Sequence, residues 1–147
     1  MPAGSSPLRD IHDRSLRLRD VVARLDDPGP RASIAALSLV FDDVTCVMTA
    51  EAADDSLSIA SGPDPLLVSG AASRSLTADE PWALAVGKPL LWSWSMTNQQ
   101  GYRDGCQLEF AEDVGDRSLV IQLIVVASSI KVRLLDEEFL PLPPSTA

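Results

Sequence analysis

Residues 90–110 read Leu-Leu-Trp-Ser-Trp-Ser-Met-Thr-Asn-Gln-Gln-Gly-Tyr-Arg-Asp-Gly-Cys-Gln-Leu-Glu-Phe, and this stretch decides the predicted fold. Every second residue from Leu90 to Met96 is large and apolar, a period of two that places one apolar row on one face of a strand. We therefore predict a half-buried strand. Its inward row is expected to share one buried face with the next strand, formed by Leu90, Trp92, Trp94, Leu108 and Phe110.

A polar loop follows this strand. It contains Gly101 and the pair Asp104-Gly105, and glycine supplies the positive φ angles that a chain reversal needs. Alternation then resumes, with Cys106 on the inward row and Gln107 on the outward one. Residues 90–110 are thus predicted to form a β-hairpin whose loop is longer than the tightest turns.

A second hairpin is expected directly after the first. Residues 119–127 are almost continuously aliphatic, as in a strand that is covered on both faces and lies inside a sheet. Ser128 and Ser129 can turn the chain into residues 130–134, where Lys131 and Arg133 would face outward.

The earlier part of the chain also predicts antiparallel strands. Two β-rich runs, 32–41 and 44–50, are separated by Asp42 and Asp43, which suits a tight hairpin or one strand with a bulge. Leu57 and Ile59 alternate with serines in a short strand that is expected at an edge.

Helical periodicity precedes these strands. Ser6 can cap a helix, Pro7 suits its first position, and prolines and glycine after Asp26 would end it. The apolar residues recur at steps of three and four, so residues 6–26 are predicted as one amphipathic helix. His12 lies off this stripe and is interpreted as solvated. The stripe consists of Leu8, Ile11, Ser15, Leu18, Val22 and Leu25.

Residues 61–80 are rich in glycine, proline and small polar side chains and are predicted as a long surface loop. Residues 79–86 suit one helical turn with Trp82 directed inward. Residues 137–147 hold three prolines and are expected to be frayed or extended.

These patterns together predict a single domain spanning residues 1–147, mainly β with some helix (α+β). The expected architecture is one antiparallel, meander-like curved sheet of about six to seven strands, with the N-terminal helix packed on it. Its parts are a helix at 6–26, a first β part at 32–60, a loop at 61–80, a second β part at 81–136 and a tail at 137–147.

Charge divides the chain unevenly. Residues 1–31 hold six arginines against five aspartates, whereas residues 32–147 hold six basic against sixteen acidic side chains, a net charge of −10. Such a balance disfavours nucleic-acid binding, which depends on Lys and Arg clusters. It suits a basic protein partner attracted over long range, although net charge also serves solubility alone. A homo-oligomer stays open.

Two cysteines and one histidine provide no zinc spacing, and no glycine-rich phosphate motif is found, so no cofactor and no metal site are predicted. Cys46 and Cys106 are expected to be inward-facing free thiols. No apolar leader and no stretch of about 20 apolar residues is seen, so we expect no membrane association and a cytoplasmic location.

Two runs carry a resemblance: residues 87–110, with Trp-Ser-Trp-Ser-Met-Thr-Asn-Gln-Gln-Gly-Tyr at their centre, and residues 122–129. They resemble a family of small bacterial proteins of unknown function. The resemblance extends more weakly back to Ala32 and covers about residues 32–135, without the predicted helix and tail. It implies a compact bacterial β-rich domain and no catalytic residue.

The densest polar cluster follows Trp94, where an aromatic wall with convergent polar groups would suit a small-molecule site. The alternative is that Asn98 and Asp104 bond the loop's own backbone. No catalytic residue is predicted, because Asp104 and Glu109 would not converge and the only histidine lies elsewhere. The candidate binding residues are Asn98, Gln99, Gln100, Tyr102, Asp104 and Glu109.

Two functions remain from the sequence. The first is a non-catalytic bacterial interaction protein, such as an acidic immunity-type antagonist of a toxic enzyme, that binds a basic protein partner. The alternative is a small-molecule binding module or an unrecognised enzyme that uses the loop from Asn98 to Asp104.

Overall fold

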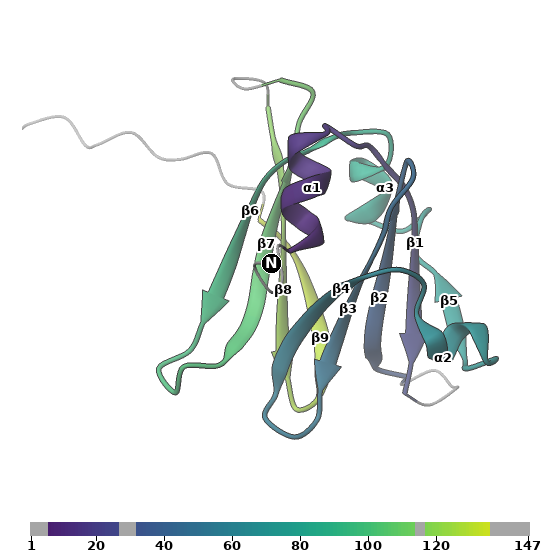
Figure 1. Cartoon of the computed structure of the whole chain (residues 1–147), viewed down its shortest axis with the longest axis vertical. Coiled ribbons are helices and arrows are strands. Elements are labelled where there is room, and N and C mark those ends of the chain that lie inside the picture. The colour runs from purple at the N-terminus through teal and green to yellow at the C-terminus, as the bar shows by residue number, and fades with distance from the viewer. Residues whose placement is uncertain (1–5, 27–31, 114–116, 136–147) are drawn as a thin grey trace, which may run out of the picture.

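The protein folds as two antiparallel β-sheets that face each other, seen in a computed structural model that describes residues 6–26, 32–113 and 117–135 (Figure 1). The prediction of a mainly β, antiparallel fold is confirmed, but the single meander-like sheet is wrong. One sheet has the order β4-β3-β2-β1-β5 and the other β6-β7-β8-β9. The strands of the first are β1 (Leu18–Leu25), β2 (Ile34–Phe41), β3 (Thr45–Glu51), β4 (Ser56–Ser61) and β5 (Ser73–Ser75). Those of the second are β6 (Leu90–Thr97), β7 (Arg103–Phe110), β8 (Leu119–Val126) and β9 (Ser129–Leu135).

The N-terminal helix is shorter than predicted. Helix α1 spans only Pro7–Asp13, and the Ser6 hydroxyl accepts a hydrogen bond from the Leu8 amide as expected of its cap. Ser15 has a φ of 51°, which breaks the helix. The second half of the predicted helix is strand β1, hydrogen-bonded to β2 on one side and β5 on the other.

The predicted hairpins are confirmed in the described residues. Strands β2 and β3 are joined across Asp42 and Asp43, and β4 lies at an edge of its sheet. Strand β8 lies inside its sheet between β7 and β9 as predicted, but it is not covered on both faces, because Val120 and Ile124 on its outer face are partly exposed. The turn between β8 and β9 is formed by Ala127 and Ser128, one residue earlier than predicted.

The core lies between the inner faces of the two sheets. Leu37, Leu39 and Met48 from the five-stranded sheet are fully buried, as are Leu108, Ile121 and Leu123 from the four-stranded one. Leu8 and Ile11 of α1 join this core, and so does Trp82 at the start of α3 (Trp82–Ala85), which is directed inward as predicted. Alternating apolar residues on both sheets therefore bury one shared interior.

The long surface loop predicted over residues 61–80 is only partly a loop, because it includes α2 (Pro65–Val68) and β5. Residues 62–72 form the crossover between β4 and β5. This crossover runs from one edge of the five-stranded sheet to the other, over its outer face (Figure 1). Asp64 caps α2 and also accepts a hydrogen bond from Arg24 of β1 at 2.8 Å, in an ion pair that is largely buried. The outward-facing Ala36 and Val47 are accordingly buried as well.

The placement of Trp92 and Trp94 in the core is wrong. Leu90 is paired with Phe110, but Trp92 is paired with Glu109, so the register shifts by one residue at Leu91. A bulge of one residue moves every later side chain to the opposite face of the strand. Both tryptophans therefore lie on the outer face of the sheet, each 46% exposed.

Candidate functional site

Three chain reversals lie at one end of the sandwich, which we call the loop end (Figure 1). They are the turn 52–55 between β3 and β4, the loop 98–102 between β6 and β7, and the turn of Ala127 and Ser128 between β8 and β9. Asp55 accepts a hydrogen bond from the Ser128 amide at 2.7 Å, which holds two of them together. The Arg103 guanidinium donates to the Leu57 carbonyl at 3.1 Å, which fixes the start of β7 beside β4.

The loop from Asn98 to Tyr102 is held in place by hydrogen bonds between the Asn98 side chain and backbone amides of the loop itself. The Asn98 side-chain oxygen accepts from the amides of Gln100 at 2.9 Å and Tyr102 at 3.2 Å. Gly101 has a φ of 87°, the left-handed conformation that glycine adopts without strain. Turn chemistry thus accounts for Asn98 and Gly101, while Gln99, Gln100 and Tyr102 are exposed.

Gly105 differs from the prediction. Its φ is not positive; instead β7 passes so close to β8 that a Cβ there would lie 2.5 Å from the Leu123 carbonyl oxygen. Gly105 is therefore required by the close approach of two strands.

The six candidate binding residues are only partly brought together. Asn98, Gln99, Gln100 and Tyr102 share the loop, and Asp104 follows at the start of β7. Glu109 lies at the far end of β7, where it accepts a hydrogen bond from the Ser118 hydroxyl at 3.0 Å. A single pocket containing all six is therefore not formed.

The turn between β3 and β4 is acidic and completes the loop end. Glu51, Asp54 and Asp55 are all exposed there. Glu51 accepts from the Ser58 hydroxyl, Asp54 from the Ser56 amide and Asp55 from Ser128, all neutral donors. Within the described residues none of these three carboxylates, nor Asp104, has an ion-pair partner, so their negative charge is fixed in place without being neutralised.

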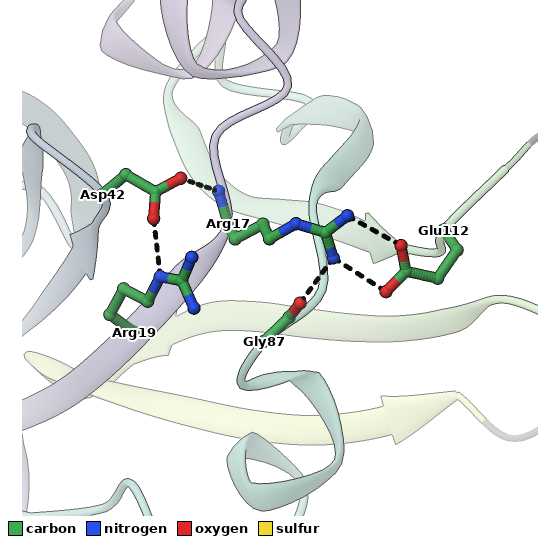
Figure 2. Close-up of polar contacts among 5 residues, drawn as sticks. All are labelled: Arg17, Arg19, Asp42, Gly87 and Glu112. Carbon is green, nitrogen blue, oxygen red and sulfur yellow. Dashed lines mark hydrogen bonds and ion pairs between the residues drawn. The ribbon is translucent and has the colours of Figure 1, made fainter.

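The opposite end of the sandwich, which carries α1 and α3, has the reverse arrangement (Figure 2). The Arg17 guanidinium donates to both oxygens of Glu112, at 2.8 and 2.9 Å, and to the Gly87 carbonyl at 2.8 Å. Asp42 accepts from the Arg17 amide at 2.9 Å and from the Arg19 side chain at 2.5 Å. These hydrogen bonds hold the pKa values of Glu112 and Asp42 below their usual range.

Further ion pairs surround this cluster. Arg14 bonds Asp10 within α1 and Asp43 in the β2–β3 turn, and Arg9 lies 3.9 Å from Asp13. The arginines of the N-terminal segment therefore compensate five of the acids at this end and, within the described residues, none of the acids at the loop end.

The cysteine and histidine side chains have surroundings that do not suit a reactive site. Cys46 and Cys106 are buried free thiols, as predicted, and burial raises the pKa of each to about 12. His12 is not solvated as expected: its ring stacks on Trp92 with centroids 5.1 Å apart. Among residues 6–26, 32–113 and 117–135, no three His, Cys, Asp or Glu side chains are grouped to hold a metal, and no helix has the length and apolarity to cross a membrane.

Comparison with known proteins assigns the chain to a family but supplies no activity. No curated protein and no solved structure matches it. A family model does match, over a longer stretch than the predicted resemblance, since it includes most of α1 and all of β1. Because the model for the family of unknown function DUF6334 matches residues 8–138, the chain belongs to that family.

Proposed function

We propose that the protein is a non-catalytic interaction protein that binds a basic protein partner at its loop end. The observation that carries this proposal is the segregation of charge between the two ends. Five carboxylates at the end with α1 lie within 4.0 Å of an arginine, and they belong to Asp10, Asp13, Asp42, Asp43 and Glu112.

At the loop end, by contrast, Glu51, Asp54 and Asp55 are bonded to neutral donors alone in the part of the chain that is described. Their positions are held by hydrogen bonds while their charge faces water, and a pre-positioned negative surface steers and orients a positively charged partner. Tyr102 of the loop 98–102, which is 43% exposed at the same end of the sandwich, supplies an aromatic contact of the kind enriched at interfaces.

Protein antagonists of toxic enzymes combine small size, an acidic surface and the absence of catalytic groups, so an immunity-type role is the specific form of this proposal. The analogy is one of profile and not of fold. The small-molecule alternative would use the side chains of Gln99, Gln100 and Tyr102, which are exposed, since Gln100 and Tyr102 engage Asn98 through backbone groups alone.

The proposal is tested by isolating partners from a lysate of the source organism and measuring association rates with the purified partner. The triple variant Glu51→Gln, Asp54→Asn, Asp55→Asn keeps the acceptor oxygens while removing three charges. We expect a roughly tenfold or greater fall in association rate at low salt, and a much smaller difference at 0.5 M salt, because screening weakens the attraction.

A matched control removes the same charge elsewhere. The triple variant Asp79→Asn, Glu80→Gln, Asp113→Asn also neutralises three exposed acids, which lie outside the loop end and are not among the five carboxylates paired with an arginine. Equal loss of association rate in both triple variants would show that only net charge matters and would refute a specific site.

The alternative function is tested by replacing Gln99, Gln100 and Tyr102 by Ala. It would be favoured if this variant lost the thermal shift produced by a small molecule while partner binding stayed intact.

A further inference from the structure

The outer face of the four-stranded sheet has its side chains in rows that run across all four strands. The central row contains Trp94 of β6, Gln107 of β7, Gln122 of β8 and Arg133 of β9. On one side of it lies the row Met96, Gly105, Ile124 and Lys131, and on the other the row Trp92, Glu109, Val120 and Leu135. We call these three rows the open face.

The two borders of the open face differ in chemistry. Strand β6 presents Trp94 and Trp92, each 46% exposed, and the ring of Trp92 is stacked on His12 of α1. Strand β9 presents Lys131 and Arg133, both exposed. Between them the Gln122 side-chain amide donates to the Gln107 side-chain oxygen at 3.0 Å, so the centre of the face is polar. Trp94 and Arg133 share a row but lie three strand spacings apart, roughly 14 Å, so they cannot meet within one chain.

We propose that the open face binds the open face of a second copy of this chain, about a two-fold axis that runs parallel to the strands. Such an axis sets β6 of each copy opposite β9 of the other and leaves every row opposite itself. Trp94 then faces Arg133 of the second copy, and the same contact occurs twice. An arginine on the face of a tryptophan is a favourable cation–π contact.

The charges of the open face select this axis. A two-fold axis perpendicular to the strands would set β9 against β9, with Arg133 opposite Arg133, and like charges brought together oppose association. The parallel axis also brings Arg133 of the second copy within one strand and one row of Glu109, an opposite charge. Facing sheets with nearly aligned strands pack about 10 Å apart, which side chains of this size can fill.

Analytical ultracentrifugation of the full chain, across a range of concentrations, tests the proposal. We expect reversible conversion of the 15.7 kDa chain into a species of twice that mass. Trp94→Ala and Arg133→Glu should each raise the dimer dissociation constant roughly tenfold or more, because both remove a contact that occurs twice. The double variant should lose less than the two effects combined, since the residues touch each other.

Arg74→Glu on β5 is the matched control, because it reverses an exposed charge on the other sheet and should leave the dimer unchanged. Thermal unfolding of each variant establishes that it is folded. A chain that stays monomeric at millimolar concentration overturns the proposal, as does a dimer that Trp94→Ala and Arg133→Glu leave intact. The proposal is also overturned if the chain is monomeric and removal of residues 136–147 makes its tryptophan fluorescence more accessible to a soluble quencher. That segment would then be the occupant of the open face. Neither the surface nor this readout involves the loop end, so the partner proposed there is tested separately.

Discussion

The inner faces of the two sheets are both apolar and buried, whereas their outer faces differ in how far the chain covers them. The outer face of the five-stranded sheet is covered by the chain itself, through the crossover 62–72 and the buried pair of Arg24 and Asp64. The outer face of the four-stranded sheet is the open face, where Trp94 is 46% exposed and Trp92, although its ring stacks on His12, is exposed to the same extent. The contrast teaches that apolar residues on a strand indicate burial only if an element of the chain reaches that face.

The largest difference should separate two tryptophans of the same chain. Trp82 is 1% exposed and packs in the core, so Trp82→Ala should cost about 3–5 kcal/mol of unfolding free energy. Trp94→Ala should cost less than ~1 kcal/mol, because its side chain is half in water. Urea denaturation of both variants measures this; similar losses would contradict the outward placement of Trp94.

Removing the cover from the five-stranded sheet should have the next largest effect. Asp64→Ala leaves the Arg24 guanidinium, only 14% exposed, without its carboxylate, and should cost about 3 kcal/mol. Adding Arg24→Met should restore part of this loss, since no charge then remains unpaired. Chemical denaturation of the single and double variants provides the measurement, and a loss below ~0.5 kcal/mol in Asp64→Ala would show that the pair does not hold the crossover.

Two glycines of the hairpin formed by β6 and β7 should respond to substitution by alanine for different reasons. Gly105→Ala should cost about 1–3 kcal/mol, because its Cβ would lie 2.5 Å from the Leu123 carbonyl oxygen. Gly101→Ala should cost about 1 kcal/mol, because its φ of 87° is strained for alanine although the space around it is open. Thermal and urea unfolding can rank them, and the reverse order would argue against the close approach of β7 and β8.

The smallest effect is expected at the exposed ion pair of Arg17 and Glu112, which connects the two sheets beside α1. The pKa of Glu112 in the folded protein lies below its ordinary value of 4.5, so the pair stabilises the fold above about that pH. This stability is lost as the pH falls through the lowered pKa. The melting temperature of Glu112→Gln should therefore fall less steeply than that of the wild type between pH 5 and roughly 3, and parallel curves would exclude the contribution.

Sequence alone was sufficient for the local features of the chain. The hairpins at 34–51 and 119–135, the edge position of β4 and the inward direction of Trp82 follow from alternation and turn residues that act over a few positions. Asn98 was likewise placed in a turn by its chemistry. These properties depend on residues that are close in sequence, and so they can be predicted from the sequence.

Tertiary structure decided the rest. Apolar residues between Leu18 and Leu25 satisfy helical spacing and also, once β2 and β5 supply hydrogen bonds, one face of a strand. Likewise, the bulge at Leu91 is set by pairing with β7, and a shift of one residue is enough to move Trp92 and Trp94 from the core to the surface. The division into two sheets, the distance of Glu109 from the loop and the compensation of charge by Arg14, Arg17 and Arg19 at one end have the same origin. Each depends on which distant segments meet, and that is determined by the packing of the whole chain.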